Sequence, residues 1–407
     1  MNLFWFLTSV LKYNLSWDKR ASVQQMKQML ESSGAVWQKF AQMLSGHEEL
    51  IGKDLANEFQ SLYFDCPAHT DEYSRDIIQR MFGDKYDLSE MKLIGSGTIA
   101  QVYKIGDKCI KVRHPNVVRE VMDAVAIYDG VKNMFFMPTA LKSVCDNFFE
   151  GLVEQLDFHR EYENGTTFKQ LMHGDTDGTN NLFIIPRMLD TSDECLVMEY
   201  EPSECLATSL DNINKHVLLR FCYGLSLLSF INILHGFIHA DIHLGNYGIR
   251  NPETPETMQI VIYDFGHMYD VRDLDFEIRR IFVLGNTEYD GIRILPLIVN
   301  EYHQQVFLSE SNMEVGNKYL FQHNLKKFIS YITFNNIKIS KHIFKLFTQS
   351  EKYCANNIIL HNLEKDPEYR YMYDDLRKST HKYYYDKYFH FDDIEILTRN
   401  TGHCITR

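Results

Sequence analysis

The sequence lacks a surplus of basic residues. Its 407 residues contain 42 Lys and Arg against 55 Asp and Glu, for a formal net charge of −13. A nucleic-acid binder uses basic side chains to neutralise phosphates. This charge balance argues against nucleic acid as a partner, although it is compatible with small local basic patches.

Paired cysteines are also missing. The chain has eight cysteines, with no Cys-x-x-Cys pair and no cluster, at positions 66, 109, 145, 195, 205, 222, 354 and 404. A secreted disulfide scaffold or a zinc ribbon would show such clusters. We therefore expect reduced thiols, packed as structural residues, in a reducing intracellular compartment.

Long apolar runs are absent too. A transmembrane helix needs about 18 or more apolar residues, and the stretch that comes closest, Val217 to Phe237, is interrupted by polar side chains. The apolar start, MNLFWFLTSVL, is too short to span a bilayer, and neither a cleavage pattern nor an Arg-rich transit segment follows it. We expect it to begin a buried or partner-packing helix, with a weak signal anchor or an interfacial membrane segment as the alternative, so peripheral membrane association stays open.

The residues that are present can bury more than one core. With 45% hydrophobic and 24% charged residues, the chain is expected to form two or three subdomains. From Ala21 to about Ser89 the pattern is helical. Lys39 and Gln42 lie there beside an apolar stripe, and solvent exposure is the simplest interpretation of this pair. The stripe recurs at three- and four-residue steps at Val36, Trp37, Phe40, Met43 and Leu44.

Near Met91 the pattern changes to an alternation of apolar and polar residues. The stretch LIGSGTIAQVYKIGDKCIKVRHP is interrupted by two turn signals, and it predicts a strand, a hairpin and a second strand. Glycines at 95 and 97, with Ala100 where a third would sit, let a backbone approach phosphates closely. The predicted nucleotide-binding loop comprises Ile94, Gly95, Ser96, Gly97, Thr98, Ile99, Ala100, Gln101 and Val102.

A lysine strengthens this interpretation of the loop. Alone, the glycine run would be typical of an ordinary hairpin, but Lys111 lies in the next predicted strand, where its ammonium can reach the α- and β-phosphates of a nucleotide. A Walker loop would lead directly into a helix and does not fit. From Asn147 to Met172 the pattern is helical again, and Glu154, Asp157 and Glu161 fall on one side of that helix. One of these acids is needed to hold Lys111, although a solvent-exposed face is the alternative interpretation.

Chemistry is concentrated in GFIHADIHLGN, at 236 to 246, and in the later triplet that begins at Asp264. Asp241 can accept or orient the proton of an attacking hydroxyl group, and Asn246 and Asp264 offer hard oxygen ligands to Mg²⁺. A long apolar helix, Val217 to Leu234, leads to this loop, and a strand, Gln259 to Tyr263, leads to Asp264. His239 and His243 flank Asp241 without a third ligand, so a scaffolding role for His239 is favoured over a metal site.

The remaining segments give less information about chemistry. Leu196 to Tyr200 predicts a short buried strand before the Pro202 turn. Leu274 to Leu284 and Ile292 to Gln305 have helical spacing. The aromatic tail from Ser311 is expected to be a packed helical appendage, with a partner surface as the alternative.

Together these motifs resemble the UbiB/ADCK family of atypical kinases over residues 34 to about 290. The resemblance rests on GAVWQKFAQ (34 to 42), GSGTIAQVY (95 to 103), IKVRHP (110 to 115), EQLDFHREYEN (154 to 164), HADIHLGN (239 to 246) and DFG (264 to 266). It implies an α+β, two-lobed protein-kinase-like fold. We expect a helical N-terminal extension over 1–89, a β-rich N-lobe over 90–201, a helical C-lobe over 202–310 and a helical appendage over 311–407.

The resemblance also implies roles for individual residues. Lys111 would contact the phosphates of ATP with Glu161 as its helix partner, Asp241 would be the catalytic aspartate, and Asn246 and Asp264 would bind Mg²⁺. Lys39 and Gln42 match the family's KxGQ element, whose extension folds over the active site. Ordinary protein phosphorylation is then less expected than ATP hydrolysis or transfer to a small or lipid-linked acceptor.

Three departures from the family pattern are visible. Ala41 replaces a Gly, Gln155 replaces the first acid of an ExD element and leaves only Asp157, and the loop carries glycines where some members have alanines. We expect Lys39 to turn to Asp157 or Glu154, or to lose its partner, so that the extension is held less tightly.

Three functions remain open from the sequence. The first is an ATP- and Mg²⁺-dependent kinase or ATPase acting on a small-molecule, lipid-linked or protein acceptor. The second is a nucleotide-binding scaffold that regulates lipid or quinone metabolism with little turnover. The third is a small-molecule kinase of the aminoglycoside or choline type, against which the KxGQ-like helix argues. The sequence does not indicate an oligomeric state.

Overall fold

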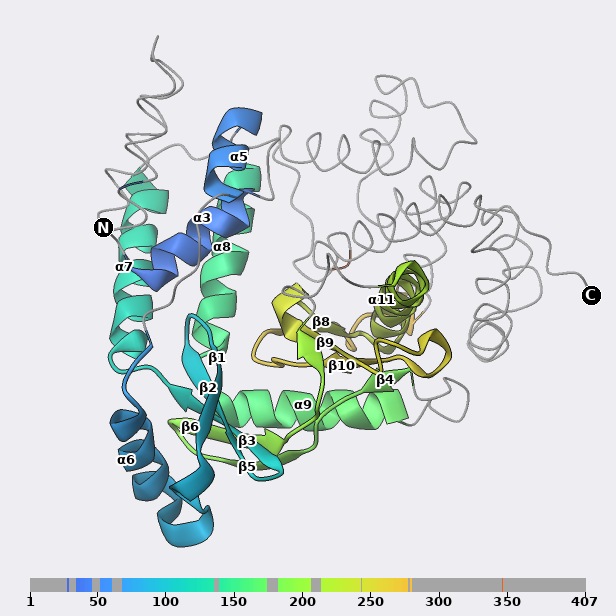
Figure 1. Cartoon of the computed structure of the whole chain (residues 1–407). Coiled ribbons are helices and arrows are strands. Elements are labelled where there is room, and N and C mark those ends of the chain that lie inside the picture. Colours follow the sequence, from blue (N-terminus) through green and yellow to red (C-terminus); the bar gives the residue numbers. More distant parts are fainter. Residues whose placement is uncertain are drawn as a thin grey trace, which may run out of the picture. The chain divides into compact units, whose positions relative to one another are not determined.

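The computed structural model describes residues 28, 34–45, 52–60, 68–134, 139–173, 182–205, 214–242, 244–276, 279 and 346. The chain divides into two compact units (Figure 1). The first unit comprises Met1–Tyr162 and Met188–Tyr200, and the second comprises Glu163–Arg187 and Glu201–Arg407. Each unit is described by itself below.

The first unit contains a five-stranded antiparallel sheet in the order β1-β2-β3-β6-β5 (Figure 1). Its strands are β1 (Lys92–Ser96), β2 (Ala100–Ile105), β3 (Lys108–Arg113), β5 (Met188–Thr191) and β6 (Cys195–Glu199). The sequence predicted only two strands between 91 and 115, but both turn signals connect strands, so three are formed. The buried strand expected at 196 to 200 is confirmed as β6.

Helix α6 (Asp71–Phe82) covers part of this sheet. The hydroxyl of Thr70 caps its first turn by accepting the amide of Tyr73, which satisfies one otherwise unpaired donor. Its buried Ile77 and Ile78 pack in one core with Tyr103 and other sheet residues. Short 3₁₀ turns, Gly83–Lys85 and Leu88–Glu90, follow before β1 begins.

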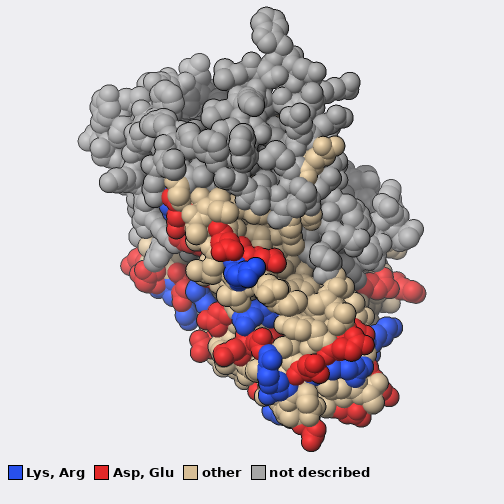
Figure 2. Space-filling model, turned by 90° about the vertical axis from the view of Figure 1, so that its left-hand side faces the viewer, with Lys and Arg blue, Asp and Glu red and all other residues tan. Residues whose placement is uncertain are grey.

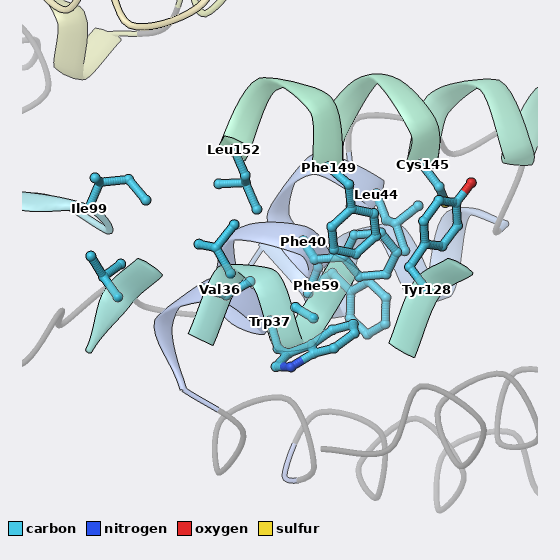
Figure 3. Packing of buried hydrophobic residues seen from close by; sticks show 14 of the residues in the cluster. Val36, Trp37, Phe40, Leu44, Phe59, Ile99, Tyr128, Cys145, Phe149 and Leu152 are labelled. Atoms are coloured by element: carbon cyan, nitrogen blue, oxygen red, sulfur yellow. The ribbon is translucent and has the colours of Figure 1, made fainter. Parts of the chain in front are cut away.

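A second core of the first unit lies among four helices: α3 (Ala35–Ser45), α5 (Lys53–Gln60), α7 (Val117–Met134) and α8 (Thr139–Glu154). Figure 3 shows this core, in which Phe40 and Phe149 stack with ring centroids 5.5 Å apart. Tyr128 also stacks on Phe149, at 4.7 Å. The predicted apolar stripe of the extension is confirmed: four of its residues are buried and Met43 packs against them. Each large side chain buried this way contributes about 1.5–3 kcal/mol.

The helix predicted from 147 to 172 is wrong in one respect, because it is two helices. Helix α8 ends at Glu154, and α9 (Phe158–His173) begins after a break at Gln155 to Asp157. The Asp157 carboxylate accepts the backbone amide of Arg160, which is the bond of a helix N-cap. The predicted common face of the three acids is therefore absent, since Glu154, Asp157 and Glu161 belong to the end of one helix, the cap of the next and its first turn.

The second unit is built around α11 (Lys215–His235), which confirms the long apolar helix. It contains a four-stranded sheet in the order β4-β10-β9-β7 and a two-stranded sheet of β11 and β8. At Gly224 of α11 a Cβ atom would lie 2.3 Å from the side chain of Ile260, so glycine allows close packing of helix on sheet. The strands are β4 (Phe183–Ile184), β7 (Glu204–Cys205), β8 (Phe237–His239), β9 (Tyr247–Arg250), β10 (Gln259–Ile262) and β11 (Met268–Asp270), with 3₁₀ turns at Leu244–Asn246 and Pro255–Thr257.

By length and hydropathy, α11 is the one helix among the described residues that could span a membrane. Most of its apolar window, 76%, is buried inside the protein. A core helix of a globular unit has this property, and we describe α11 as one.

Charged side chains of both signs are interspersed over the described part of the face that Figure 2 shows. Some of the oppositely charged side chains of the first unit form ion pairs, for example Arg80 with Glu194 and Lys85 with Asp190. Exposed pairs of this kind contribute little, about 0–1 kcal/mol each.

Several sequence predictions lie outside the described residues. These are the N-terminal stretch, the helix at Ile292 to Gln305, the part of Leu274 to Leu284 other than residues 274–276 and 279, and the tail from Ser311 except Leu346. Among the described cysteines, Cys109, Cys145, Cys195 and Cys222 are free thiols, as the scattered spacing predicted.

Candidate active site

A buried ion pair lies at the centre of the first unit's candidate site. The ammonium of Lys111, on β3, donates to both carboxylate oxygens of Glu161, on α9, at 2.9 Å each. Glu161 is 0% exposed and Lys111 is 9% exposed. Burying two charges is costly unless each finds its partner in good geometry, and the two-oxygen contact meets that condition.

The helix break explains why Glu161, of the three acids considered, holds Lys111. Because Asp157 caps α9, Glu161 falls in its first turn, and its amide bonds the Asp157 carbonyl at 3.0 Å. Glu154 instead pairs with Arg160 at 3.0 Å. Lys111 stands opposite Val102 of β2 and Leu196 of β6 in the sheet register, so the strand fixes its direction.

The predicted nucleotide loop, Ile94 to Val102, comprises the end of β1, the turn at 97–99 and the start of β2. Its turn is closed by the amide of Gly97, which donates to the carbonyl of Ala100 at 2.9 Å. A Cβ atom at Gly95 would meet no atom within 4 Å, and one at Gly97 would meet only the Ala100 oxygen, at 3.7 Å. Packing within the protein therefore does not require glycine at either position, which fits a backbone left open for close approach by a ligand.

The other loop residues differ in exposure. The stretch from Ile94 to Gly97 is exposed, and Thr98 and Val102 are half-buried. Ile99, Ala100 and Gln101 are buried, and the side-chain oxygen of Gln101 accepts the hydroxyl of Tyr103 at 3.1 Å. The side chain of Gln101 thus supports the loop from inside the sheet, and its predicted contact with a nucleotide stays a prediction.

In the second unit, backbone bonds connect the HADIHLGN loop to the DFG segment. His239 of β8 is paired with Met268 of β11, and the amide of Ala240 donates to the carbonyl of His267 at 3.1 Å. The His239 ring donates through Nε2 to the Tyr263 carbonyl, at 2.9 Å. A scaffolding role with a bond to the backbone of the loop itself was expected for His239; the contact is instead made to Tyr263, the residue between β10 and DFG. His243 lies outside the described residues.

Asn246 orders the loop around Asp241. Its Nδ2 donates to the backbone carbonyl of Asp241 at 2.8 Å, and its own carbonyl accepts the amide of Tyr263 at 2.9 Å. Because the amide nitrogen is directed to Asp241, the oxygen Oδ1 is the atom that a cation would meet. Hard oxygen ligands of this kind suit Mg²⁺.

Asp264 occupies an unusual backbone conformation. Its φ angle of 59° lies in the left-handed region, which Asp tolerates better than most residues. Its carboxylate accepts the Gly266 amide at 3.3 Å. The following residue, Phe265, is buried against Phe168 and His239. The bond from Gly266 and the buried Phe265 ring therefore restrain the direction of the Asp264 carboxylate.

A contact between α9 and the DFG segment was not predicted from the sequence. Asn164, at the end of REYEN, donates from Nδ2 to the carbonyl of Phe265 at 2.9 Å. This contact anchors the DFG segment to α9. In the sequence, the position of Asn164 at the end of the REYEN motif was the signal that could have indicated this role.

Burial shapes the electrostatics beneath the loop. The pKa of Tyr247 is raised, first by burial and then by the nearby Asp241 carboxylate, so its hydroxyl stays protonated. Among the described residues no group of three or more His, Cys, Asp or Glu side chains could hold a metal. A cation at Asn246 and Asp264 would thus need further ligands from a bound phosphate or water.

Comparison with known proteins identifies the family. The model of the ABC1 atypical kinase-like domain matches residues 65–291. This chain belongs to the ABC1 atypical kinase-like family. The resemblance to UbiB/ADCK kinases and the two-lobed kinase-like α+β fold expected from it are thereby confirmed.

Relatives of this ABC1-family chain come from distant organisms. It is 26% identical to the probable serine/threonine-protein kinase abkC of Dictyostelium discoideum, over 56% of this chain and 35% of abkC. It is 25% identical to the ABC1 family protein MCP2 homolog of Schizosaccharomyces pombe, covering 60% and 46%. A probable protein kinase UbiB of Aliivibrio fischeri is 23% identical, covering 60% and 47%. The chain thus spans about half or less of the length of these relatives.

The family's helical extension element is joined to the rest of the first unit by Lys39. Its ammonium donates to the Oε1 atom of Gln155, at 3.1 Å. This partner is the amide that replaced the family's acid, a contact that was not expected, while the expected turn to Asp157 or Glu154 stays a prediction. Ala41, at the family's Gly position, is 0% exposed inside the helical core. Gln42 is half-buried, and its carbonyl accepts the Ser45 hydroxyl at 2.6 Å.

Proposed function

We propose that this chain binds ATP with Mg²⁺ and transfers or hydrolyses the terminal phosphoryl group. The observation that carries the proposal is the buried pair of Lys111 and Glu161. A buried ammonium fixed by two carboxylate oxygens is a costly structure, and in kinase-like folds it positions the phosphates of a nucleotide.

We assign the proposed roles within each unit separately. In the first unit, Lys111 would hold the α- and β-phosphates while the backbone of the loop around Gly97 covers them. In the second unit, the Asp241 carboxylate would accept or orient the proton of the attacking hydroxyl or water. Asn246 and Asp264 would hold Mg²⁺, which supplies charge neutralisation at the phosphates.

For the acceptor we propose a small or lipid-linked hydroxyl compound, or water. Support comes from α3, whose aromatic residues Trp37 and Phe40 are buried in the first unit's helical core. By resemblance to the family, this docked extension restricts access of protein substrates. The relatives named as probable protein kinases leave a protein acceptor as the alternative outcome.

Calorimetric titration with ATP, with and without Mg²⁺, tests the binding part of the proposal. The wild type should bind more tightly when Mg²⁺ is present. Asp264→Ala should lose most of this difference, because it removes a hard cation ligand. Binding that ignores both Mg²⁺ and the substitution would contradict the assignment. Tight binding without any release or transfer of label from ATP would favour the scaffold function.

A further inference from the structure

Two histidines far apart in the sequence contact one another beneath the predicted nucleotide loop. His69, before α6, and His114, after β3, approach through their Nδ1 atoms at 2.7 Å. The second nitrogen of His114, Nε2, lies 2.9 Å from the Gly97 carbonyl, and that of His69 lies 2.6 Å from the Ser74 hydroxyl. All four residues belong to the first unit.

His114 is attached to the loop twice. Besides the ring contact to Gly97, its backbone amide donates to the carbonyl of Ile99 at 2.9 Å. The loop's own bond, from the Gly97 amide to the Ala100 carbonyl, closes the same turn. A glycine-containing turn with little packing around it loses considerable entropy when it is ordered, and these contacts offset part of that cost before any ligand arrives.

The hydrogen bonds run in series from the Gly97 carbonyl through His114 and His69 to the Ser74 hydroxyl, and the carbonyl determines where the protons lie. A carbonyl only accepts, so His114 must donate to Gly97 from Nε2–H. A neutral His114 then presents a bare Nδ1, to which His69 donates from Nδ1–H. A neutral His69 in turn accepts the Ser74 hydroxyl proton at Nε2. Each imidazole is thereby fixed in one tautomer, and the two tautomers are different.

The surroundings keep both rings neutral. Burial, followed by the proximity of His114, lowers the pKa of His69 to about 4, against the opposing charge of Asp71. Burial also lowers the pKa of His114, although the Gly97 carbonyl and Glu120 oppose it. Tyr73 packs edge-on against His69, with ring centroids 4.8 Å apart.

A shared metal ion does not explain the pair. Two nitrogens at about 2.0–2.1 Å from one zinc ion in tetrahedral geometry are roughly 3.3 Å apart, which is longer than the observed 2.7 Å. The separation is that of a short N–H···N hydrogen bond.

We propose that His69 and His114 are positioning residues for the nucleotide loop. His69 fixes the tautomer of His114, and His114 holds the carbonyls of Gly97 and Ile99 in the conformation that receives phosphates. This inference rests on the proposed nucleotide binding. It adds two residues that contact no substrate but reduce the ordering that binding requires.

Paired amide substitutions test the proposal, because the Asn amide superimposes on Nδ1 of a histidine and the Gln amide on Nε2. His69→Asn retains a donor toward His114, and His114→Gln retains a donor toward Gly97, so both should bind MgADP like the wild type. His69→Gln and His114→Asn place the amide at the wrong nitrogen and should bind about three- to tenfold more weakly, the effect of one lost hydrogen bond.

A double variant separates positioning from general damage. In His114→Gln the new amide donates to Gly97 without help, so His69 has no tautomer to set. Adding His69→Gln to that variant should therefore cause no further loss of MgADP affinity. His159→Asn is the matched control: His159 is exposed and contacts Asp193, and the substitution should leave affinity unchanged. Equal losses in all four single variants, or an Asn and Gln order opposite to the one above, would overturn the proposal.

Nitrogen-15 NMR of the imidazoles provides a test that needs neither nucleotide nor substitution. At pH 7.5 the proposal expects His69 protonated on Nδ1 and His114 protonated on Nε2. Two Nε2–H rings, or a charged ring, would overturn it. If the wild type fails to bind MgADP while the two tautomers are as expected, the proposed function fails and the ordered histidine pair stands.

Discussion

At the scale of single residues, the buried ion pair of Lys111 and Glu161 is the main support for the proposed function. Lys111 and Glu161 could be paired from the sequence because a kinase-like strand lysine needs a helix acid, and three acids were available. The residues alone left the choice among these acids open and the family resemblance implied Glu161, but the helix break that places Glu161 in the first turn of α9 was not predicted. The His69 and His114 pair was missed altogether, because a contact between residues 45 apart leaves no local pattern.

Glu161→Gln should destabilise the first unit. The substitution leaves the buried ammonium of Lys111 beside a neutral amide, and breaking a buried pair from one side costs about 3 kcal/mol. Urea unfolding should show this loss, and adding Lys111→Met should recover most of it because no charge is then buried. Lys85→Met, in the exposed pair with Asp190, should change stability by less than about 1 kcal/mol. An equal loss in both single variants would contradict the account.

Acid should destabilise the first unit partly through His69. Its pKa is lowered to about 4 in the folded protein, against about 6.5 in an unfolded chain. The folded state therefore binds fewer protons between these values, so stability is complete above pH 6.5 and falls as pH decreases toward 4. His69→Asn should show a shallower fall over this window in unfolding measured at pH 7.5, 6 and 5. Identical slopes in wild type and variant would exclude His69 as a cause.

At the scale of helices and strands, periodicity predicted most elements but not where they end. The apolar stripe from Val36 to Leu44 and the long helix before the HADIHLGN loop were both correct. The boundary between α8 and α9 was missed because it contains neither Gly nor Pro. Its available signal was Asp157, a residue favoured as an N-cap, three residues before Arg160.

Asp157→Ala tests that boundary. The variant loses the carboxylate that caps α9 at the Arg160 amide, and cap removal typically costs about 0.5–2 kcal/mol. Thermal unfolding should register the loss, and Asp157→Ser or Asp157→Asn should restore most of it. No rescue by these capping residues would mean that Asp157 acts in another way.

The contact between α3 and the residues after α8 is a second prediction at this scale. Gln155 is 5% exposed, and Gln155→Glu would convert its bond with Lys39 into an ion pair. We expect a tighter extension, by about 1–3 kcal/mol if the charge is well paired, and slower ATP turnover if the extension restricts the site. If both turnover and stability are unchanged in this variant, the hypothesis that Gln155 loosens the extension is contradicted.

At the scale of the whole chain, the order of the motifs carried the family assignment. Their sequence from the glycine loop to DFG predicted a kinase-like fold, and the match over residues 65–291 supports it. The pairing of the strands could not be predicted from composition, because the neighbouring strands β3 and β6 are separated by about 80 residues of sequence. The acceptor is not encoded in any of these motifs, because they handle only the phosphates and the cation.

The most direct test of the central proposal is release or transfer of the terminal phosphoryl group from labelled MgATP, measured for wild type and Asp241→Asn with binding followed in parallel. Asp241→Asn keeps the loop's shape, since its contact with Asn246 uses the backbone carbonyl. We predict wild-type turnover, unchanged ATP affinity in the variant, and a rate lower by about 10²–10⁴. Equal rates in the two proteins, or wild-type binding without any turnover, would contradict it.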